Sequence, residues 1–246
     1  MNANAIGILG GSFDPIHNGH VSLAKSALDH LPLADLRVMP AKEPPHKSGY
    51  ITSESDRLAM LRLVFDDLPN CQIDERELRS TRTSYSVLTL RELRQEVGNE
   101  VPLCFIMGWD SIQALATWWH WRELFELVNI AVAYRPGYAG FDSADVKREI
   151  DKRMVSIGAL CRQPAGAVAH LPMADAPVAS SDIRRALAAR NQAESSQAEN
   201  SQAENKECNE SDRREADPIL TDSILKKMVP NVVADYIVQH GLYADY

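Results

Sequence analysis

Short apolar runs recur from Ile6 to about Val178, separated by segments whose apolar residues stand three or four apart. The runs are compact and rich in valine, isoleucine and leucine, which is typical of strands buried on both faces of a parallel sheet. We therefore predict six strands: Ile6–Leu9, Leu36–Met39, Cys71–Ile73, Leu103–Met107, Ile130–Tyr134 and Val168–Leu171.

The segments between these runs have helical periodicity. Apolar residues would line one face of a helix at positions 21, 24, 28 and 31, at 58, 61, 64 and 65, and at 85, 88 and 93. Ser53, followed by Glu54 and Asp56, predicts a capped start for the second of these helices. The alternation indicates the α/β class, a parallel sheet with helices on both faces and right-handed crossovers. In such sheets, ligands bind at the carboxyl ends of the strands.

Residues 191–217 interrupt this pattern with three near-identical pentads and a polar, charged continuation. Because the segment has almost no large apolar residue, we predict a low-complexity, disordered insertion; a transient helix is the alternative. An amphipathic pattern resumes over Ile219–Leu242 and ends at His240 and Gly241, which predicts a helix C-cap. The expected organisation is one domain built from residues 1–190 and 218–246.

The composition is that of a globular protein, with 45% apolar and 24% charged residues and a formal charge of −8. Collagen, coiled coil and disulfide scaffold are excluded, and the acidic balance argues against a nucleic-acid coat protein. The insertion holds 8 acidic and 3 basic residues, so the rest of the chain carries only −3. The four scattered cysteines predict neither a zinc site nor a disulfide framework. Without a secretory leader or a membrane span, a soluble cytoplasmic protein with no membrane partner is expected.

Residues 10–20 read GGSFDPIHNGH and lie between the first predicted strand and the first predicted helix. Glycines let the backbone approach a ligand closely, and a helix start offers amide N–H groups to an anion. The segment is neither a dinucleotide fingerprint nor a P-loop, but it places His17 and His20 where phosphates would bind. A helix-capping or core histidine is the alternative for each.

This segment resembles the signature of the HxGH nucleotidyltransferase superfamily, and its GGSFDPxH form resembles bacterial nicotinate-nucleotide adenylyltransferases in particular. Further stretches of the chain resemble that family in the same order: PPHK at 44–47, SYSVLTL at 84–90, MGWDS at 107–111, WWHW at 118–121, VASSDIR at 178–184, and YI…GLY at 236–243. The sequence departs from the family at Ser181, where threonine is frequent, and at Leu88, where aspartate is frequent.

The resemblance implies a Rossmann-like nucleotidyltransferase fold and adenylyl transfer from ATP to nicotinate mononucleotide, giving deamido-NAD and pyrophosphate in NAD biosynthesis. It implies catalytic roles for His17, His20 and Arg184. The implied ATP contacts are Gly10, Gly11, Ser12, Phe13, His17, His20, Gly108, Asp110, Ser180, Ser181, Ile183 and Arg184. Those to the mononucleotide are Lys47, Tyr85, Ser86, Trp118, Trp119 and Arg135.

For several of these residues a structural role is an open alternative. Asp110 would meet the ribose hydroxyls or simply cap a helix, and Ser180 with Arg184 would bind phosphates or form an ordinary capped helix. Trp118 would stack on the pyridine ring or pack in the core, whereas Trp121 is assigned to packing. Lys47 and Arg135 would each bind an acidic group of the substrate or remain solvated.

The chemistry of the residues agrees with this reaction. A phosphate monoester is mostly dianionic at neutral pH, so its attack on the α-phosphorus of ATP needs no protein nucleophile, only positioning and charge stabilisation. Mg²⁺ would enter with ATP, held partly by substrate oxygens, and no dedicated protein metal site is expected. The rival functions are another HxGH enzyme such as a phosphopantetheine adenylyltransferase, a nucleotide-binding regulator, and an RNA-binding relative of class I synthetases. We expect no nucleic-acid partner and a monomer or small homo-oligomer.

Overall fold

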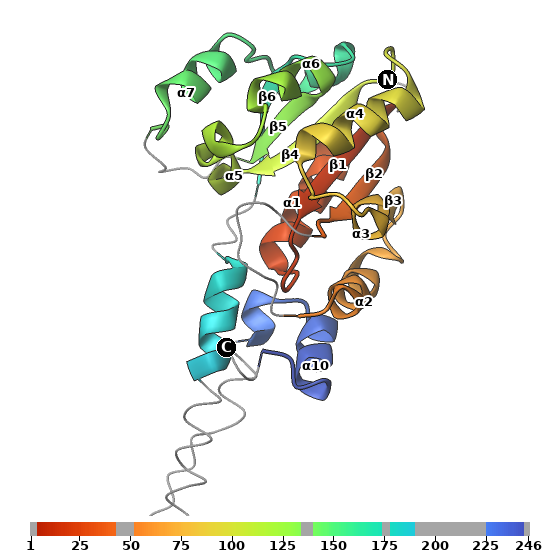
Figure 1. Ribbon diagram of the computed structural model, residues 1–246, viewed down its shortest axis with the longest axis vertical. Coiled ribbons are helices and arrows are strands. Elements are labelled where there is room, and N and C mark those ends of the chain that lie inside the picture. The colour runs from red at the N-terminus through yellow and green to blue at the C-terminus, as the bar shows by residue number, and fades with distance from the viewer. Residues whose placement is uncertain (1–3, 43–51, 134–139, 174–177, 190–224, 244–246) are drawn as a thin grey trace, which may run out of the picture.

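The computed structural model describes residues 4–42, 52–133, 140–173, 178–189 and 225–243. Six parallel strands form one sheet in the order β3-β2-β1-β4-β5-β6 (Figure 1). The strands are β1 (Ala5–Gly11), β2 (Leu33–Pro40), β3 (Cys71–Ile73), β4 (Leu103–Gly108), β5 (Asn129–Ala133) and β6 (Val168–Leu171). All six predicted strands are therefore confirmed. The chain leaves the middle of the sheet in opposite directions from β1 and β4, and this switch point is where doubly wound sheets bind ligands.

Helices cover both faces of the sheet, as predicted. The labelled helices are α1 (Asn18–His30), α2 (Glu54–Phe65), α3 (Arg76–Arg79), α4 (Ser86–Val97), α5 (Trp109–Gln113), α6 (Leu124–Leu127), α7 (Ala144–Asp151) and α10 (Asn231–Gln239). Short 3-10 turns span Leu115–Thr117, Trp121–Glu123 and Ile157–Arg162. Residues 180–189 and 225–228 are also helical.

Side-chain alternation along the strands divides the core into two layers. In β4, Cys104 and Ile106 point toward α1, α2 and α10, whereas Phe105 and Met107 point toward α4, α5 and α6. Successive residues of a strand face opposite sides, so a strand that is apolar throughout supplies both layers. This is the physical reason why compact apolar runs, without an alternating polar pattern, predicted these strands.

The start of α2 confirms the predicted cap. The Ser53 hydroxyl accepts a hydrogen bond from the Asp56 backbone N–H at 3.0 Å, and both acidic residues lie in the first turn. Negative side chains at this end interact favourably with the helix dipole.

The C-terminal pattern is split where the sequence predicted one amphipathic stretch. Residues 225–228 are helical, Pro230 follows, and α10 starts at Asn231. Proline has no backbone N–H, so it disrupts the interior of a helix. It is tolerated at a helix start, where the backbone N–H groups have no acceptor within the helix. The predicted C-cap is confirmed: the amides of Gly241 and Leu242 donate to the carbonyls of Val238 and Ile237, and Gly241 has φ +58°.

The residues that follow the insertion in sequence pack into the same core as the first strand. Val233, Ile237 and Tyr243 share one apolar cluster with Leu9 and Phe13. Figure 1 shows α10 beside α2 and the helical residues 180–189 nearby. The insertion at 191–217 lies outside the described residues, so its disorder remains a prediction.

Two sequence expectations concern membrane spans and disulfide bonds. Within the described ranges, no helix combines the length and apolarity required to cross a bilayer. The described cysteines, Cys71, Cys104 and Cys161, form no disulfide.

Candidate active site

The loop between β1 and α1 carries the two histidines of the sequence motif. His17 is the N-cap of α1, with extended backbone, and His20 lies in the first helical turn. The His17 backbone N–H donates to Nδ1 of His20 at 3.3 Å, and the two rings stack with centroids 3.7 Å apart. Because a backbone N–H can only donate, Nδ1 of His20 acts as the acceptor. The neutral ring therefore carries its proton on Nε2, the nitrogen that a phosphate oxygen could approach.

Phe13 supports this pair from inside the core. Its ring is fully buried and meets the His20 ring edge-on, with centroids 4.8 Å apart. Gly11 lies against the same ring, because a Cβ built on Gly11 would stand 3.0 Å from it. The glycine thus permits the close approach of the loop to its own core.

The helix at 180–189 is tied to this loop by two side-chain hydrogen bonds. Nη1 of Arg184 donates to the Asp14 carbonyl at 2.6 Å, and the Ser180 hydroxyl donates to the Pro15 carbonyl at 3.1 Å. These hydrogen bonds join segments that are 170 and 165 positions apart in the sequence, so the two segments meet at one edge of the sheet. The structure brings Arg184 and both histidines together, as the resemblance implied.

These groups line one cavity of about 380 Å³, which we call the histidine cavity. Ten of the twelve predicted ATP contacts are among its lining residues: Gly10, Gly11, Ser12, His17, His20, Gly108, Asp110, Ser180, Ser181 and Arg184. The other two are Phe13 and Ile183, whose side chains are fully buried in the core. Both side chains therefore pack in the core, and contacts of these two residues with ATP remain a prediction.

Asp110 lies in the first turn of α5, directly after β4. The N-cap of this helix is Gly108, and the Asp110 side chain is exposed at the cavity. The alternative that Asp110 caps the helix is therefore wrong, and its carboxylate can face a ligand.

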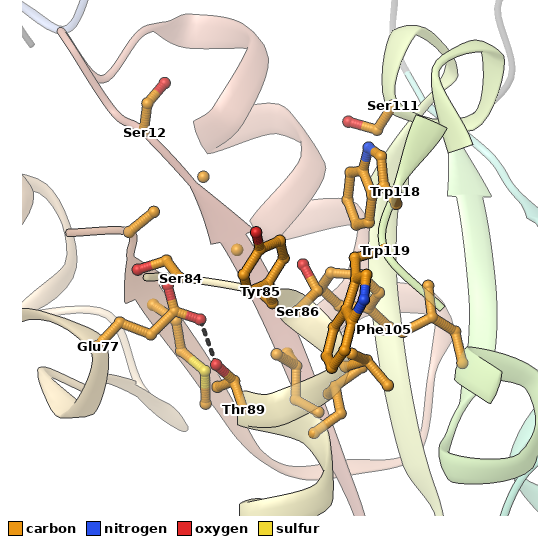
Figure 2. A pocket seen from close by; sticks show the side chains of 18 of the residues that line it. Ser12, Glu77, Ser84, Tyr85, Ser86, Thr89, Phe105, Ser111, Trp118 and Trp119 are labelled. Atoms are coloured by element: carbon orange, nitrogen blue, oxygen red, sulfur yellow. Dashed lines mark hydrogen bonds between the residues drawn. The ribbon is translucent and has the colours of Figure 1, made fainter. Parts of the chain in front are cut away.

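A second cavity of about 370 Å³, here called the aromatic cavity, adjoins the first. The two share lining residues at the switch point of the sheet: Gly10, Gly11, Ser12, Phe105, Asp110, Ser111 and Trp118. Figure 2 shows Trp118 and Trp119 on one side of the aromatic cavity and Glu77 and Thr89 on the other, with Tyr85 between them. All four predicted substrate contacts that the structure describes, Tyr85, Ser86, Trp118 and Trp119, line this cavity.

The tryptophans separate by environment. Trp121 is buried and its ring lies edge-on to Phe125, so its assignment to packing is confirmed. Trp118 is half-buried, whereas Trp119 is 43% exposed and lies 5.1 Å from the Tyr85 ring. Trp118 and Trp119 can therefore offer ring surface to a planar ligand.

The start of α4 determines which backbone amide faces the aromatic cavity. The resemblance implies that backbone amides near Tyr85 and Ser86 bind the nicotinate carboxylate, but the Tyr85 N–H already donates to the Thr83 carbonyl at 2.9 Å. Ser86 is the first residue of α4. The first amides of a helix have no acceptor within the helix, so Ser86 is the better candidate for binding a carboxylate.

Glu77 is a cavity residue that sequence reasoning missed. Its Oε1 accepts a hydrogen bond from the Thr89 hydroxyl at 2.6 Å, and burial raises the pKa of its carboxyl above the usual range. In the sequence, Glu77 stands in a charged run that resembles a solvated surface. Only the packing of α3 against α4 would have identified it.

Arg57 was also missed, although its side chain is fully buried. Its Nη1 donates to the Ser12 carbonyl at 2.7 Å and to the Ala41 carbonyl at 2.9 Å. The guanidinium thus joins the segments that follow β1 and β2 and fixes the loop that lines both cavities. Its position in an amphipathic helix suggested nothing beyond an exposed charge.

The remaining sequence expectations concern Lys47, Arg135 and the absence of a dedicated metal site. Lys47, with the PPHK segment at 44–47, and Arg135 lie outside the described residues. Among the parts of the chain that are described, no group of three or more His, Cys, Asp and Glu side chains could hold a metal ion.

Comparison with known proteins gives the same assignment. The family model described as cytidylyltransferase-like matches residues 8–186. A protein of Hahella chejuensis named "Probable nicotinate-nucleotide adenylyltransferase" is 42% identical over 166 residues, which is 67% of this chain and 76% of that protein. The chain belongs to the nicotinate-nucleotide adenylyltransferases of the cytidylyltransferase-like family.

Two further proteins are similar to this chain. A protein of Laribacter hongkongensis, also named "Probable nicotinate-nucleotide adenylyltransferase", is 46% identical over 134 residues, which is 54% of this chain and 61% of that protein. The nicotinic acid mononucleotide adenylyltransferase of Plasmodium falciparum, solved with NaAD, has a TM-score of 0.64 at 18% identity. The match covers 98% of this chain and 97% of that chain, which establishes that the two proteins share a fold.

Proposed function

We propose that the protein transfers the adenylyl group of ATP to nicotinate mononucleotide, giving deamido-NAD and pyrophosphate in NAD biosynthesis. The observation that carries the proposal is the pair of adjoining cavities, one lined by His17, His20 and Arg184 and the other by Trp118 and Trp119. A transferase that joins two nucleotides needs such neighbouring sites with a common wall. The names of the family relatives support these two substrates.

ATP would occupy the histidine cavity. The His20 ring donates from Nε2 to a phosphate oxygen, and Arg184 lies within the same cavity to bind the outer phosphates. Asp110, exposed after β4, would accept hydrogen bonds from the ribose hydroxyls. Residues Ser180 and Ser181 open a helix whose N-terminus is suited to an anion.

Nicotinate mononucleotide would occupy the aromatic cavity. Its pyridine ring stacks on Trp118, flanked by Trp119 and Tyr85, and its carboxylate binds the amide at Ser86. Lys47 and Arg135 are proposed to bind its acidic groups.

In the reaction, a phosphate oxygen of the mononucleotide attacks the α-phosphorus of ATP. A new P–O bond forms as the bond to pyrophosphate breaks, and the electron pair leaves with pyrophosphate. The attacking phosphate is mostly dianionic at neutral pH, so the protein needs no general base. The chain therefore contributes orientation and positive charge, which suffices for phosphoryl-type transfer.

Mg²⁺ would enter as the ATP complex and neutralise charge on the phosphates. Magnesium prefers oxygen ligands, and the polar side chains among the described residues that line the histidine cavity are mainly His, Ser and Arg, with Asp110 as the acidic oxygen donor. This donor set fits an ion held chiefly by substrate oxygens.

Pyrophosphate release from Mg-ATP tests the proposal. Nicotinate mononucleotide, nicotinamide mononucleotide and phosphopantetheine are offered separately to the purified protein and to His17→Ala and His30→Ala variants. We expect the highest turnover with the nicotinate compound and a loss of about 100-fold in kcat for His17→Ala, as for other residues that stabilise developing charge. His30 lies in the last turn of the same helix, so its variant should retain activity.

Turnover with phosphopantetheine alone would assign the protein to the rival transferase. No turnover with any acceptor would favour the nucleotide-binding regulator.

A further inference from the structure

The chain's C-terminal segment contacts the loop that carries the histidines. Tyr243 is 3% exposed, and its hydroxyl donates to Oδ1 of Asp14 at 2.8 Å. The Thr52 hydroxyl donates to the same oxygen at 2.7 Å. Three segments that are distant in sequence therefore meet at one buried carboxylate.

Asp14 connects this cluster to the histidine cavity through its own backbone. Its carbonyl accepts the 2.6 Å hydrogen bond from Arg184, and the next carbonyl, of Pro15, accepts from Ser180. The side chain of Asp14 is thus held from the C-terminal segment, while its backbone holds the helix at 180–189. A backbone movement of this residue would therefore shift the carbonyl that Arg184 binds.

The Tyr243 hydroxyl is suited to remain a donor. Burial, together with the charge of Asp14, raises its pKa well above the usual range for tyrosine. The hydroxyl therefore stays protonated at neutral pH. The chain reaches this position through the glycine turn at Gly241, and Tyr243 itself has φ +65°.

We infer that Tyr243 is a positioning residue for the transfer reaction, which acts through Asp14 to hold Arg184 in its cavity position. Tyr243 is not among the residues that line either cavity, so it would not touch substrates bound there. The inference takes the identity of the substrates from the proposed function. The hydrogen bonds of Asp14 on which it rests do not depend on that function.

Tyr243→Phe removes only the hydroxyl and keeps the buried ring. The chain offers a matched control in Tyr236, whose hydroxyl donates to Oδ1 of Asp56 at 3.0 Å. Asp56 lies in the first turn of α2 and lines neither cavity. Both substitutions thus delete a tyrosine–aspartate hydrogen bond of the same C-terminal segment, but only one of these bonds involves the histidine loop.

The measurements are kcat and KM for ATP with nicotinate mononucleotide, the Kd of α,β-methylene ATP with Mg²⁺ by calorimetry, and the Tm. For Tyr243→Phe we expect kcat to fall and the Kd to rise by about three- to tenfold, the range for a residue that acts through a neighbour. Tyr236→Phe should change both by less than twofold. Thr52→Val, which removes the second donor to Asp14, should shift kcat and Kd in the same direction as Tyr243→Phe.

Equal kinetics and affinity for the Tyr243 and Tyr236 variants would overturn the inference, whatever their Tm values. If Tyr243→Phe does not fold, Thr52→Val decides in the same way against the Tyr236 control. If the wild-type protein transfers nothing to nicotinate mononucleotide, the proposed function fails while the analogue affinities still decide the role of Tyr243. In that case, a rise in Kd for Tyr243→Phe and Thr52→Val, but not for Tyr236→Phe, would support the role of Tyr243.

Discussion

At the residue scale, a single backbone amide decides how His20 can act. The His17 N–H occupies Nδ1 of His20, so the ring presents Nε2–H to the cavity. The HxGH spacing produces this geometry locally, because residues at the N-cap and three positions later face each other in any helix start. The motif alone therefore predicted that both histidines lie where the first strand leads into the first helix.

Trp118 offers a direct test of the aromatic cavity. Trp118→Leu should raise KM for nicotinate mononucleotide about tenfold, because stacking of a base-like ring contributes about 1–3 kcal/mol. KM for ATP should change less, because the pyridine ring would lie in the aromatic cavity. Steady-state kinetics with each substrate varied in turn would measure both constants.

Trp121→Phe is the matched control for that variant. Trp121 is 7% exposed and packs on Phe125, so this substitution should lower the Tm and leave both KM values unchanged. A similar rise in KM for the two variants would show that the effect of Trp118 is structural.

At the element scale, helix ends place most of the candidate groups. His17 caps α1, Ser86 opens α4, and Asp110 lies in the first turn of α5. Each of these starts follows the carboxyl end of a strand or a connecting loop, where helix amides and side chains converge on one edge of the sheet.

The end of α10 supports the buried tyrosine. Gly241 has φ +58°, and no atom lies within 4 Å of a Cβ built on it, so Gly241→Ala meets backbone strain without a clash. The left-handed conformation should cost about 1 kcal/mol. For a chain of this size that lowers the Tm by about 2–4 °C.

Differential scanning calorimetry on the purified variant measures this change. Gly158→Ala is the control, because Gly158 lies outside the left-handed region and its Cβ would also meet no atom within 4 Å. An equal loss of Tm for the two alanine variants would argue against strain at Gly241.

At the scale of the whole molecule, ion pairs on the surface contribute to the dependence of stability on pH. Hydrogen bonds from Arg91 lower the pKa of Glu123, and hydrogen bonds from Lys152 and Arg153 lower that of Glu149. A carboxyl whose pKa is lower in the folded state stabilises the fold above its unfolded pKa, about 4.3 for glutamate. This contribution is lost as the pH falls through the folded pKa.

Glu123→Gln should therefore lower the Tm at pH 7 and have a progressively smaller effect below about pH 4. The exposed Glu126, in the neighbouring helix α6, provides a Glu126→Gln control that should follow the wild-type curve. Thermal unfolding between pH 3 and 7 tests this. A constant difference between wild type and Glu123→Gln across that range would contradict it. Salt at 1 M should reduce the difference, because exposed charges are screened.

The sequence by itself determined the six strands, the α/β class and the position of the histidine motif. These are local properties: a strand buried on both faces must be apolar throughout, and the HxGH spacing lies within one helix start. The sequence did not predict the break at Pro230, because amphipathic periodicity continues on both sides of the proline.

Only the tertiary structure decided which distant residues share a site. Arg184 and Tyr243 meet Asp14 across 170 and 229 positions of sequence, and Glu77 and Arg57 become buried only when helices pack on the sheet. It likewise placed the side chains of Phe13 and Ile183 in the core, and it left the amide of Ser86, rather than that of Tyr85, as the candidate to bind a carboxylate. Burial and hydrogen-bond partners depend on which elements pack together, and spacing along the chain does not encode that directly.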